Sequence, residues 1–205
     1  MSKNSSVIST ISENTNTLTV EFKKPSNRYL DRFIKSKASV DLLKYKIYPN
    51  AKEVTEAYGM LNAAKEYLLR DINWKIICVG DGSTPRCGAL FAFHTRHEVF
   101  SVDPALPKDH AEKYLDIDRL HTVPYQIQDC DYSGKNGLII SCHSHAKLSI
   151  VLKHCKYENT VLISMPCCVP DDLDKSLLHS YNEDWGVHSP QRRINIYHIV
   201  NKQLK

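Results

Sequence analysis

The chain has 205 residues, of which 42% are hydrophobic and 24% charged, and its formal net charge is +4. This composition is ordinary for one globular domain with a sizeable core, and no apolar run of about 18 residues is present, which excludes a membrane-spanning helix. The polar N-terminus lacks the apolar region of a secretory signal, so the sequence predicts an intracellular, cytoplasmic protein. Its seven cysteines, an odd number, are expected to be reduced thiols.

The N-terminal quarter of the chain divides into two parts. Residues 1–20 are rich in Ser, Thr and Asn and are predicted to be a mobile tail. Residues 21–50 are predicted to form a basic helical extension, with one helical segment over residues 26–47 that ends before Pro49. Its apolar residues recur at near-helical spacing: Tyr29, Phe33, Val40, Leu43 and Ile47.

The same extension carries an excess of positive charge. Between Phe22 and Pro49 the acidic residues are Asp31 and Asp41, whereas the basic residues are Lys23, Lys24, Arg28, Arg32, Lys35, Lys37, Lys44 and Lys46. Aromatic residues are interleaved, and such a stretch can bind a phosphate backbone and stack bases, so RNA is a possible partner through Lys23–Lys46. The alternative is a solvated helix face with its apolar side packed down. A protein partner or an oligomer is also open.

Residues 51–72 are predicted to form the best helix of the chain. One apolar stripe contains Val54, Ala57, Tyr58, Leu61, Ala64, Leu68 and Leu69. The charged residues Glu53, Glu56, Lys65, Glu66 and Arg70 lie off that stripe, and the helix is expected to pack on the sheet. The remainder, residues 51–205, is predicted to be the main domain.

The stretch from Trp74 to Pro104 reads as strand, glycine turn, helix and strand. The apolar run Ile76–Val79 is typical of a strand that is buried on both faces. Gly80-Asp81-Gly82 breaks it, and Ser83, Thr84 and Pro85 are suited to begin a helix. A second strand, Val99–Val102, ends at Asp103, 21 residues after Gly82, where nucleotide-binding units of this kind place an acid for a ribose hydroxyl.

Helices and strands continue to alternate after Pro104. The predicted helices are 108–115, 147–154 and 171–180, and the predicted strands are 120–128, 138–141, 160–165, 185–187 and 193–200. Pro124 places the first of these strands away from the sheet centre. The alternation predicts an α/β fold, a doubly wound and mostly parallel sheet with an antiparallel C-terminal edge hairpin. Its ligand is expected at the carboxyl ends of the strands.

The glycine turn discriminates between ligands. No Lys-Ser or Lys-Thr follows it, which argues against a phosphate-binding P-loop. Pro85 stands where a dinucleotide-binding turn requires a third glycine, which argues against a dehydrogenase. The remaining common ligand of this layout is S-adenosylmethionine, which has a ribose and an adenine but no pyrophosphate.

With these motifs, roughly residues 50–205 resemble the class I, Rossmann-like S-adenosylmethionine-dependent methyltransferases. The segments that carry the resemblance are ICVGDG, SVDP, QDCD and the final hairpin. A narrower likeness, to a methyltransferase-like branch with a His/Cys cluster, rests on SCHSHA (Ser141–Ala146) and MPCCVP (Met165–Pro170). Two departures stand out: Cys78 occupies the position of a usual acid, and the fourth strand lacks the Asp-Pro-Pro-aromatic and Asn-Pro-Pro-aromatic signatures.

The resemblance implies a role for each loop at this edge of the sheet. Gly80, Asp81 and Gly82 would line the methionine part of S-adenosylmethionine, and Asp103 would bind the ribose hydroxyls. Asp129, Cys130 or Asp131 would contact the adenine. Ser141, Cys142 and His143 would flank the methyl group. The sequence thus predicts a methyltransferase whose acceptor is RNA, and the alternative is a catalytically degenerate module that binds RNA or a protein partner.

Two histidines are the candidate catalytic residues. His143 or His145 could take a proton from the acceptor, because the unperturbed pKa of imidazole is near neutral. The alternative is that one of them packs at the sheet edge and the other is solvated. The soft ligands Cys142, His143, His145, Cys155, Cys167 and Cys168 lack zinc-site spacing, and adjacent cysteines diverge in an extended chain, so no metal site is predicted.

Overall fold

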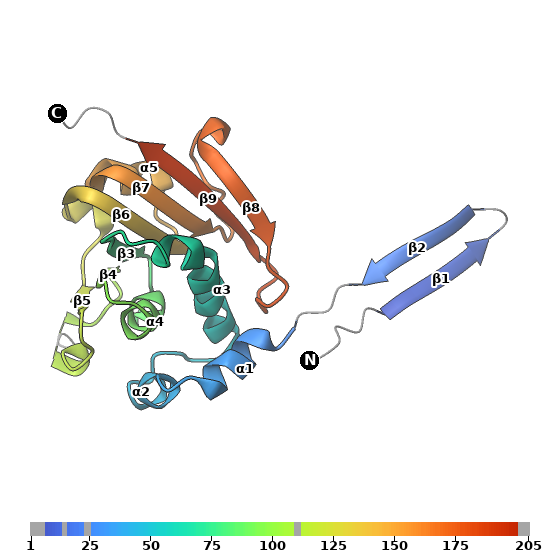
Figure 1. Ribbon diagram of the computed structural model, residues 1–205, viewed down its shortest axis with the longest axis horizontal. Helices are drawn as coiled ribbons and strands as arrows, with labels where there is room; N and C mark the ends of the chain where they lie inside the picture. The colour runs from blue at the N-terminus through green and yellow to red at the C-terminus, as the bar shows by residue number, and fades with distance from the viewer. Residues whose placement is uncertain (1–6, 14–15, 23–25, 109–111, 201–205) are drawn as a thin grey trace.

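A computed structural model describes residues 7–13, 16–22, 26–108 and 112–200 (Figure 1). Its centre is a seven-stranded sheet in the order β5-β4-β3-β6-β7-β9-β8. The strands are β3 (Lys75–Val79), β4 (Glu98–Val102), β5 (Leu120–Val123), β6 (Tyr132–Cys142), β7 (Cys155–Met165), β8 (Leu178–Glu183) and β9 (Arg193–Val200). The helices are α1 (Arg28–Lys35), α2 (Ser39–Lys44), α3 (Ala51–Leu68), α4 (Arg86–His94) and α5 (Leu148–His154).

The first five strands of the sheet are parallel, and β8 and β9 form an antiparallel hairpin at one edge. The predicted fold class is confirmed. From β3 the chain winds outward through β4 to β5, then returns to place β6 on the other side of β3. The strand order therefore reverses between β3 and β6, and such a reversal opens a crevice at the carboxyl ends of the strands.

The central strand β3 is buried on both faces, as its apolar run predicts. Ile76 and Cys78 face a core built with α1, α2, α3 and α4, whereas Ile77 and Val79 face a second core that includes α5. Figure 1 shows the first four helices gathered on one side of the sheet. This period of two is the consequence of strand geometry and explains why a continuous apolar run is needed here.

The basic extension folds as two helices rather than one. Ser36 is extended (φ −77°, ψ 137°) and separates α1 from α2. Tyr29 and Phe33 are buried in the core with Tyr58 of α3, while the basic residues Lys35 and Lys37 are exposed. For Tyr29 and Phe33 the structure matches the alternative, in which the apolar side of the helix packs on the core and the basic side faces solvent. These two rings are therefore not free to stack on bases.

The predicted strands 138–141 and 160–165 are parts of the longer strands β6 and β7. Three further predicted elements are wrong in type or in where they end. Strand β5 ends at Val123 because Pro124 cannot continue the ladder, and a 3₁₀ turn, Ile127–Asp129, follows. Residues 171–180 do not form the predicted α-helix: Lys175–Leu177 is a 3₁₀ turn and β8 begins at Leu178. The Asp171 carboxylate accepts hydrogen bonds from the side chains of Ser164, Asn195 and Tyr197, which hold the start of the segment against the sheet. The first strand of the hairpin is β8, whereas residues 185–187 form a turn.

Two other predictions fall partly on residues outside the description. The structure has antiparallel strands β1 (Val7–Glu13) and β2 (Asn16–Phe22), where the sequence predicts a mobile tail over residues 1–20 and the start of the helical extension at residue 21; Figure 1 shows both strands apart from the seven-stranded sheet. The alternation of apolar residues with Thr and Glu over residues 17–22 is the strand signal. Of the predicted helix over 108–115, residues 109–111 are not described, and Glu112–Tyr114 is a 3₁₀ turn.

No described helix combines the length and the apolar character that a membrane crossing requires.

Candidate functional site

A cavity of about 610 Å³ opens where β3, β4 and β6 end, at the reversal of strand order. Its volume lies in the range of small-molecule sites, and its position is the one expected for the ligand of a doubly wound sheet. Its walls come from the glycine turn after β3, the acid after β4, the loop after β5, the loop after β6 and the first turns of α3.

The glycine turn gives the cavity a wall of bare backbone. Gly80 and Gly82 have φ of +71° and +85°, which glycine adopts without strain. A Cβ at Gly80 would lie 2.1 Å from Oγ and 2.5 Å from Cβ of Ser144 in the loop after β6. The turn and this loop can therefore approach each other only because residue 80 has no side chain.

Asp103 faces the turn, as the sequence predicts. Its Oδ2 accepts a hydrogen bond from the Gly82 N–H at 2.8 Å, and its Oδ1 accepts one from the Ala105 N–H at 2.7 Å. Both Gly82 and Asp103 line the cavity. A carboxylate offers about four lone-pair positions, so two remain for the hydroxyls of a ligand.

Asp81 also lines the cavity, but the hydrogen bonds that its carboxylate accepts hold the fold together. It accepts hydrogen bonds from the N–H groups of Cys87 and Gly88 at 2.7 and 2.8 Å, and from the Ser101 hydroxyl at 2.8 Å. Two N–H groups of the first turn of α4 thereby find acceptors. Asp81, and not the predicted caps Ser83 and Thr84, therefore caps this helix. Burial raises the pKa of Asp81 to about 6, although these hydrogen bonds oppose the shift.

The opposite wall contains an imidazole–carboxylate pair. Nε2 of His143 lies 3.0 Å from Oε1 of Glu56, and Nζ of Lys52 lies 3.1 Å from the same oxygen. His143 adopts φ +50°, and its backbone N–H donates to the carbonyl of Met165. This hydrogen bond holds the loop after β6 against the end of β7. Burial tends to raise the pKa of Glu56, but the charges and hydrogen bonds of His143 and Lys52 outweigh it and lower the pKa.

Glu56 was not identified from the sequence. It is one of the charged residues off the apolar stripe of α3, yet only 4% of its surface is exposed. Glu56 is buried because His143, from the loop after β6, lies against its carboxylate. Glu53, one turn earlier, is paired with Arg86 of α4, and all three of these residues line the cavity.

The two remaining predicted residues of the loop after β6 also line the cavity. Cys142 is half-buried and contacts the Cys87 thiol, which raises the pKa of Cys87 together with burial. His145 is exposed at the rim, so the two candidate catalytic histidines differ. His143 is held by a buried carboxylate, whereas Nε2 of His145 lies 3.7 Å from Sγ of Cys168.

Four predicted residues are not among those that line the cavity. Asp129 and Asp131 are exposed, Cys130 is half-buried, and Ser141 is buried within β6. Their place is taken by Gln126, Ile127 and Gln128. The early end of β5 at Pro124 explains the shift, because the chain turns at the cavity before it reaches the two acids.

No protein-family model matches the sequence, and no curated protein matches it. Among solved structures, the chain is similar to a mutant of MtNAS in complex with S-adenosylmethionine, with a TM-score of 0.52 and 13% identity over 84% of this chain and 70% of that one. It is also similar to magnesium protoporphyrin IX methyltransferase (ChlM) from Synechocystis PCC 6803 with bound SAH, with a TM-score of 0.47 and 9% identity over 86% and 100% of the two chains. For phosphoethanolamine N-methyltransferase 1 of Haemonchus contortus the TM-score is 0.47, with 10% identity over 88% of this chain and 51% of that one.

At these identities the likeness concerns the fold. The chain has the Rossmann-like fold of the class I S-adenosylmethionine-dependent methyltransferases, as the sequence predicts.

Proposed function

We propose that the protein is an S-adenosylmethionine-dependent methyltransferase that uses the cavity at the ends of β3, β4 and β6. The observation that carries this proposal is the arrangement of Gly80, Gly82 and Asp103: a side-chain-free turn lies against a carboxylate that retains acceptor capacity, and both line one cavity. The turn would receive the methionine part of the cofactor and Asp103 its ribose. Gln126, Ile127 and Gln128 supply polar and apolar contacts suited to an adenine.

The bound cofactor would supply a methyl group on a sulfonium, which needs little acid–base assistance beyond correct placement of the acceptor. His143 is the better candidate for a base in this protein. The buried Glu56 carboxylate orients its imidazole and would stabilise the charge that the ring gains when it accepts a proton. His145 lies at the exposed rim and has no carboxylate partner among the described residues.

For the acceptor we propose RNA, and the support is electrostatic. Lys44 and Lys46 are exposed on the segment that packs against the glycine turn, where the Thr84 hydroxyl donates to the carbonyl of Ile47 at 2.6 Å. Cations beside the mouth of a site can bind the phosphates of an acceptor strand. Burial of Tyr29 and Phe33 leaves phosphate contacts, rather than base stacking, as the contribution of this segment.

Calorimetric titration tests the cofactor. S-adenosylmethionine and S-adenosylhomocysteine should bind with micromolar affinity, NAD should not bind, and Asp103→Ala should weaken binding by about 10-fold or more, since hydrogen bonds to a charged group contribute roughly 1.5–3 kcal/mol. Asp116→Ala, at an exposed acid outside the cavity, is the matched control. Equal affinity for NAD, or no binding of either S-adenosyl compound, would refute the proposal.

A second measurement separates the enzyme from a degenerate module. Transfer of a labelled methyl group to total RNA, with protein and small-molecule fractions counted in parallel, should require the intact cavity and be lost in Asp103→Ala. Binding of S-adenosylmethionine without transfer to any fraction would favour the degenerate alternative.

A further inference from the structure

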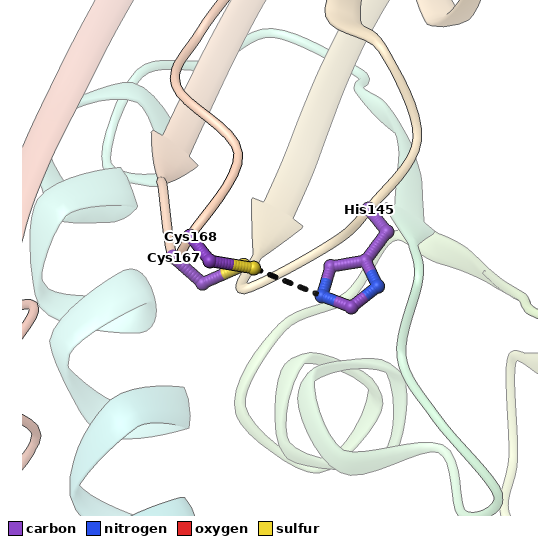
Figure 2. A group of neighbouring side chains, drawn as sticks. All are labelled: His145, Cys167 and Cys168. Carbon is purple, nitrogen blue, oxygen red and sulfur yellow. Dashed lines mark hydrogen bonds between the residues drawn. The ribbon is translucent and has the colours of Figure 1, made fainter.

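A second group of reactive side chains lies at the rim of the cavity, outside the proposed methyl-transfer machinery. His145, from the loop after β6, faces Cys167 and Cys168, from the loop after β7 (Figure 2). One ligand atom of each residue lies within 4.8 Å of the others. The sequence predicted no metal site here because adjacent cysteines diverge in an extended strand. Residues 168–169 form a bend instead, which allows both side chains to project toward the same imidazole.

Two of the three separations in this group match the edges of a coordination tetrahedron, and the third, between Cys167 and His145, is within 4.8 Å. With a Zn–S bond of about 2.3 Å and a Zn–N bond of about 2.0–2.1 Å, tetrahedral geometry places two sulfurs about 3.8 Å apart and a sulfur and a nitrogen about 3.6 Å apart. The two Sγ atoms are 3.6 Å apart, and Sγ of Cys168 lies 3.7 Å from Nε2 of His145. A disulfide would require about 2.05 Å, and both cysteines are free thiols.

The chemistry of the donors selects the kind of metal. Thiolate and imidazole ligands suit Zn²⁺, whereas Ca²⁺ and Mg²⁺ require oxygen ligands. Zinc binds the thiolate form of cysteine, and both cysteines of this group are free thiols.

We propose that His145, Cys167 and Cys168 bind a zinc ion. Three protein ligands leave the fourth position of the tetrahedron to water or to an atom of a ligand, which is the pattern of reactive rather than purely structural zinc sites. Because His145 also lines the cavity, the ion lies at its rim. This proposal does not depend on the proposed function, since it concerns metal binding by the free protein.

The test is a metal titration of the full-length protein, purified metal-free under a thiol reductant. One equivalent of Zn²⁺ should bind in competition with a chromophoric chelator, and Co²⁺ should give the thiolate charge-transfer and tetrahedral visible bands of a sulfur-containing site. Cys168→Ser and His145→Gln change exposed residues and should each weaken Zn²⁺ binding more than about 100-fold, because even partners outside the ligand set are worth 10–100-fold. Cys130→Ser, a half-buried thiol outside the group, should bind as the unaltered protein does.

Alkylation of the unaltered protein provides a readout that does not depend on the variants folding. Zn²⁺ should slow the labelling of Cys167 and Cys168, as followed by peptide mass spectrometry, and should leave Cys130 unaffected. The proposal is overturned if the protein binds no Zn²⁺, if Cys168→Ser and His145→Gln bind as tightly as the unaltered chain, or if Zn²⁺ protects Cys130 equally. Methyl transfer enters none of these measurements, so their failure would leave the cofactor proposal standing.

Discussion

The two walls of the cavity are built on different principles. The wall formed by β3, α4 and β4 consists of backbone and of carboxylates bound to backbone: Gly80 and Gly82 have no side chain, and Asp81 and Asp103 accept from N–H groups of the same unit. The wall formed by α3 and the loop after β6 contains side chains bound to side chains, such as His143 with Glu56.

The two walls differ in what sets their shape. The backbone wall has few side chains to exchange, so its shape is fixed by glycine conformation and by main-chain hydrogen bonds. The side-chain wall draws residues from distant parts of the chain, and each of them can change without altering the sheet.

The two walls also differ in how their buried carboxylates titrate. The folded-state pKa of Asp81 is raised to about 6, so folding favours its protonated form, whereas the pKa of Glu56 is lowered, so folding favours its charged form. The contribution of Asp81 to stability therefore falls as the pH rises from about 4 to about 6. The contribution of Glu56 is present above its ordinary pKa and is lost as the pH falls through its folded-state value.

The largest effect is expected from Gly80→Ala. Its Cβ would meet the Cβ and Cα of Ser144 at 2.5 and 3.0 Å, and alanine at φ +71° is strained, so the substitution should cost about 2–4 kcal/mol of unfolding free energy and more than 10-fold in affinity for S-adenosylmethionine. Urea unfolding and calorimetry measure the two quantities.

Gly134→Ala is the matched control for this prediction. Gly134 also has a positive φ, but a Cβ there makes only ordinary contact with Tyr157, and the position lies outside the cavity. It should lose stability from strain alone and keep its affinity. If Gly80→Ala binds S-adenosylmethionine as the unaltered protein does, cofactor binding does not depend on the close approach of the glycine turn to Ser144.

Asp81→Asn should cost about 1–3 kcal/mol near pH 4, because the amide nitrogen cannot accept a hydrogen bond, whereas each carboxyl oxygen of Asp81 accepts one from the N–H of Cys87 or Gly88. The cost should be greatest near pH 4 and shrink toward pH 7, since the raised pKa makes the unaltered protein lose stability over that interval. Denaturant unfolding at several pH values checks this, with the exposed Asp116→Asn as a control that should show no such trend. A cost that grows with pH would contradict the prediction.

Glu56→Gln should cost about 1–2 kcal/mol, because His143 and Lys52 lose a charged partner. Its pH dependence should have the opposite sign to that of Asp81→Asn: full cost at pH 7, and a smaller cost as the pH falls below 4.5, the ordinary pKa of the side chain. The same unfolding series measures it, and Glu66→Gln, on an exposed position of the same helix, serves as the control. If the costs of Glu56→Gln and Asp81→Asn changed with pH in the same direction, the contrast between the two walls would be lost.

The smallest effect is expected from the double change Lys44→Gln and Lys46→Gln. If these cations bind acceptor phosphates, the slope of RNA affinity against salt should fall by about two, with roughly one for each contact, and stability should not change. Fluorescence anisotropy at several salt concentrations measures the slope. The control is the double change Lys135→Gln and Lys156→Gln. Both lysines are exposed near the N-terminal ends of β6 and β7, away from the cavity, so the slope should be unaltered.

The backbone wall could be predicted from the sequence almost completely. The apolar run Ile76–Val79, the two glycines and the distance to Asp103 specify strand, turn and acid within one short stretch, and β3 and β4 begin one residue before the predicted strands and end with them. Each decision there depends on residues a few positions away: glycine for positive φ, proline at the helix start, and apolar residues where both faces are covered.

The side-chain wall was decided by the tertiary structure. Glu56 reads as one of several charged residues off the apolar stripe of its helix until His143 lies against its carboxylate, and Cys167 and Cys168 read as divergent neighbours until their loop bends toward His145. Local sequence determined which backbone each strand end would present, because dihedral preference acts over a few residues. Which side chains meet there was decided by the order of strands in the sheet, which brings distant segments together through packing that no local pattern encodes.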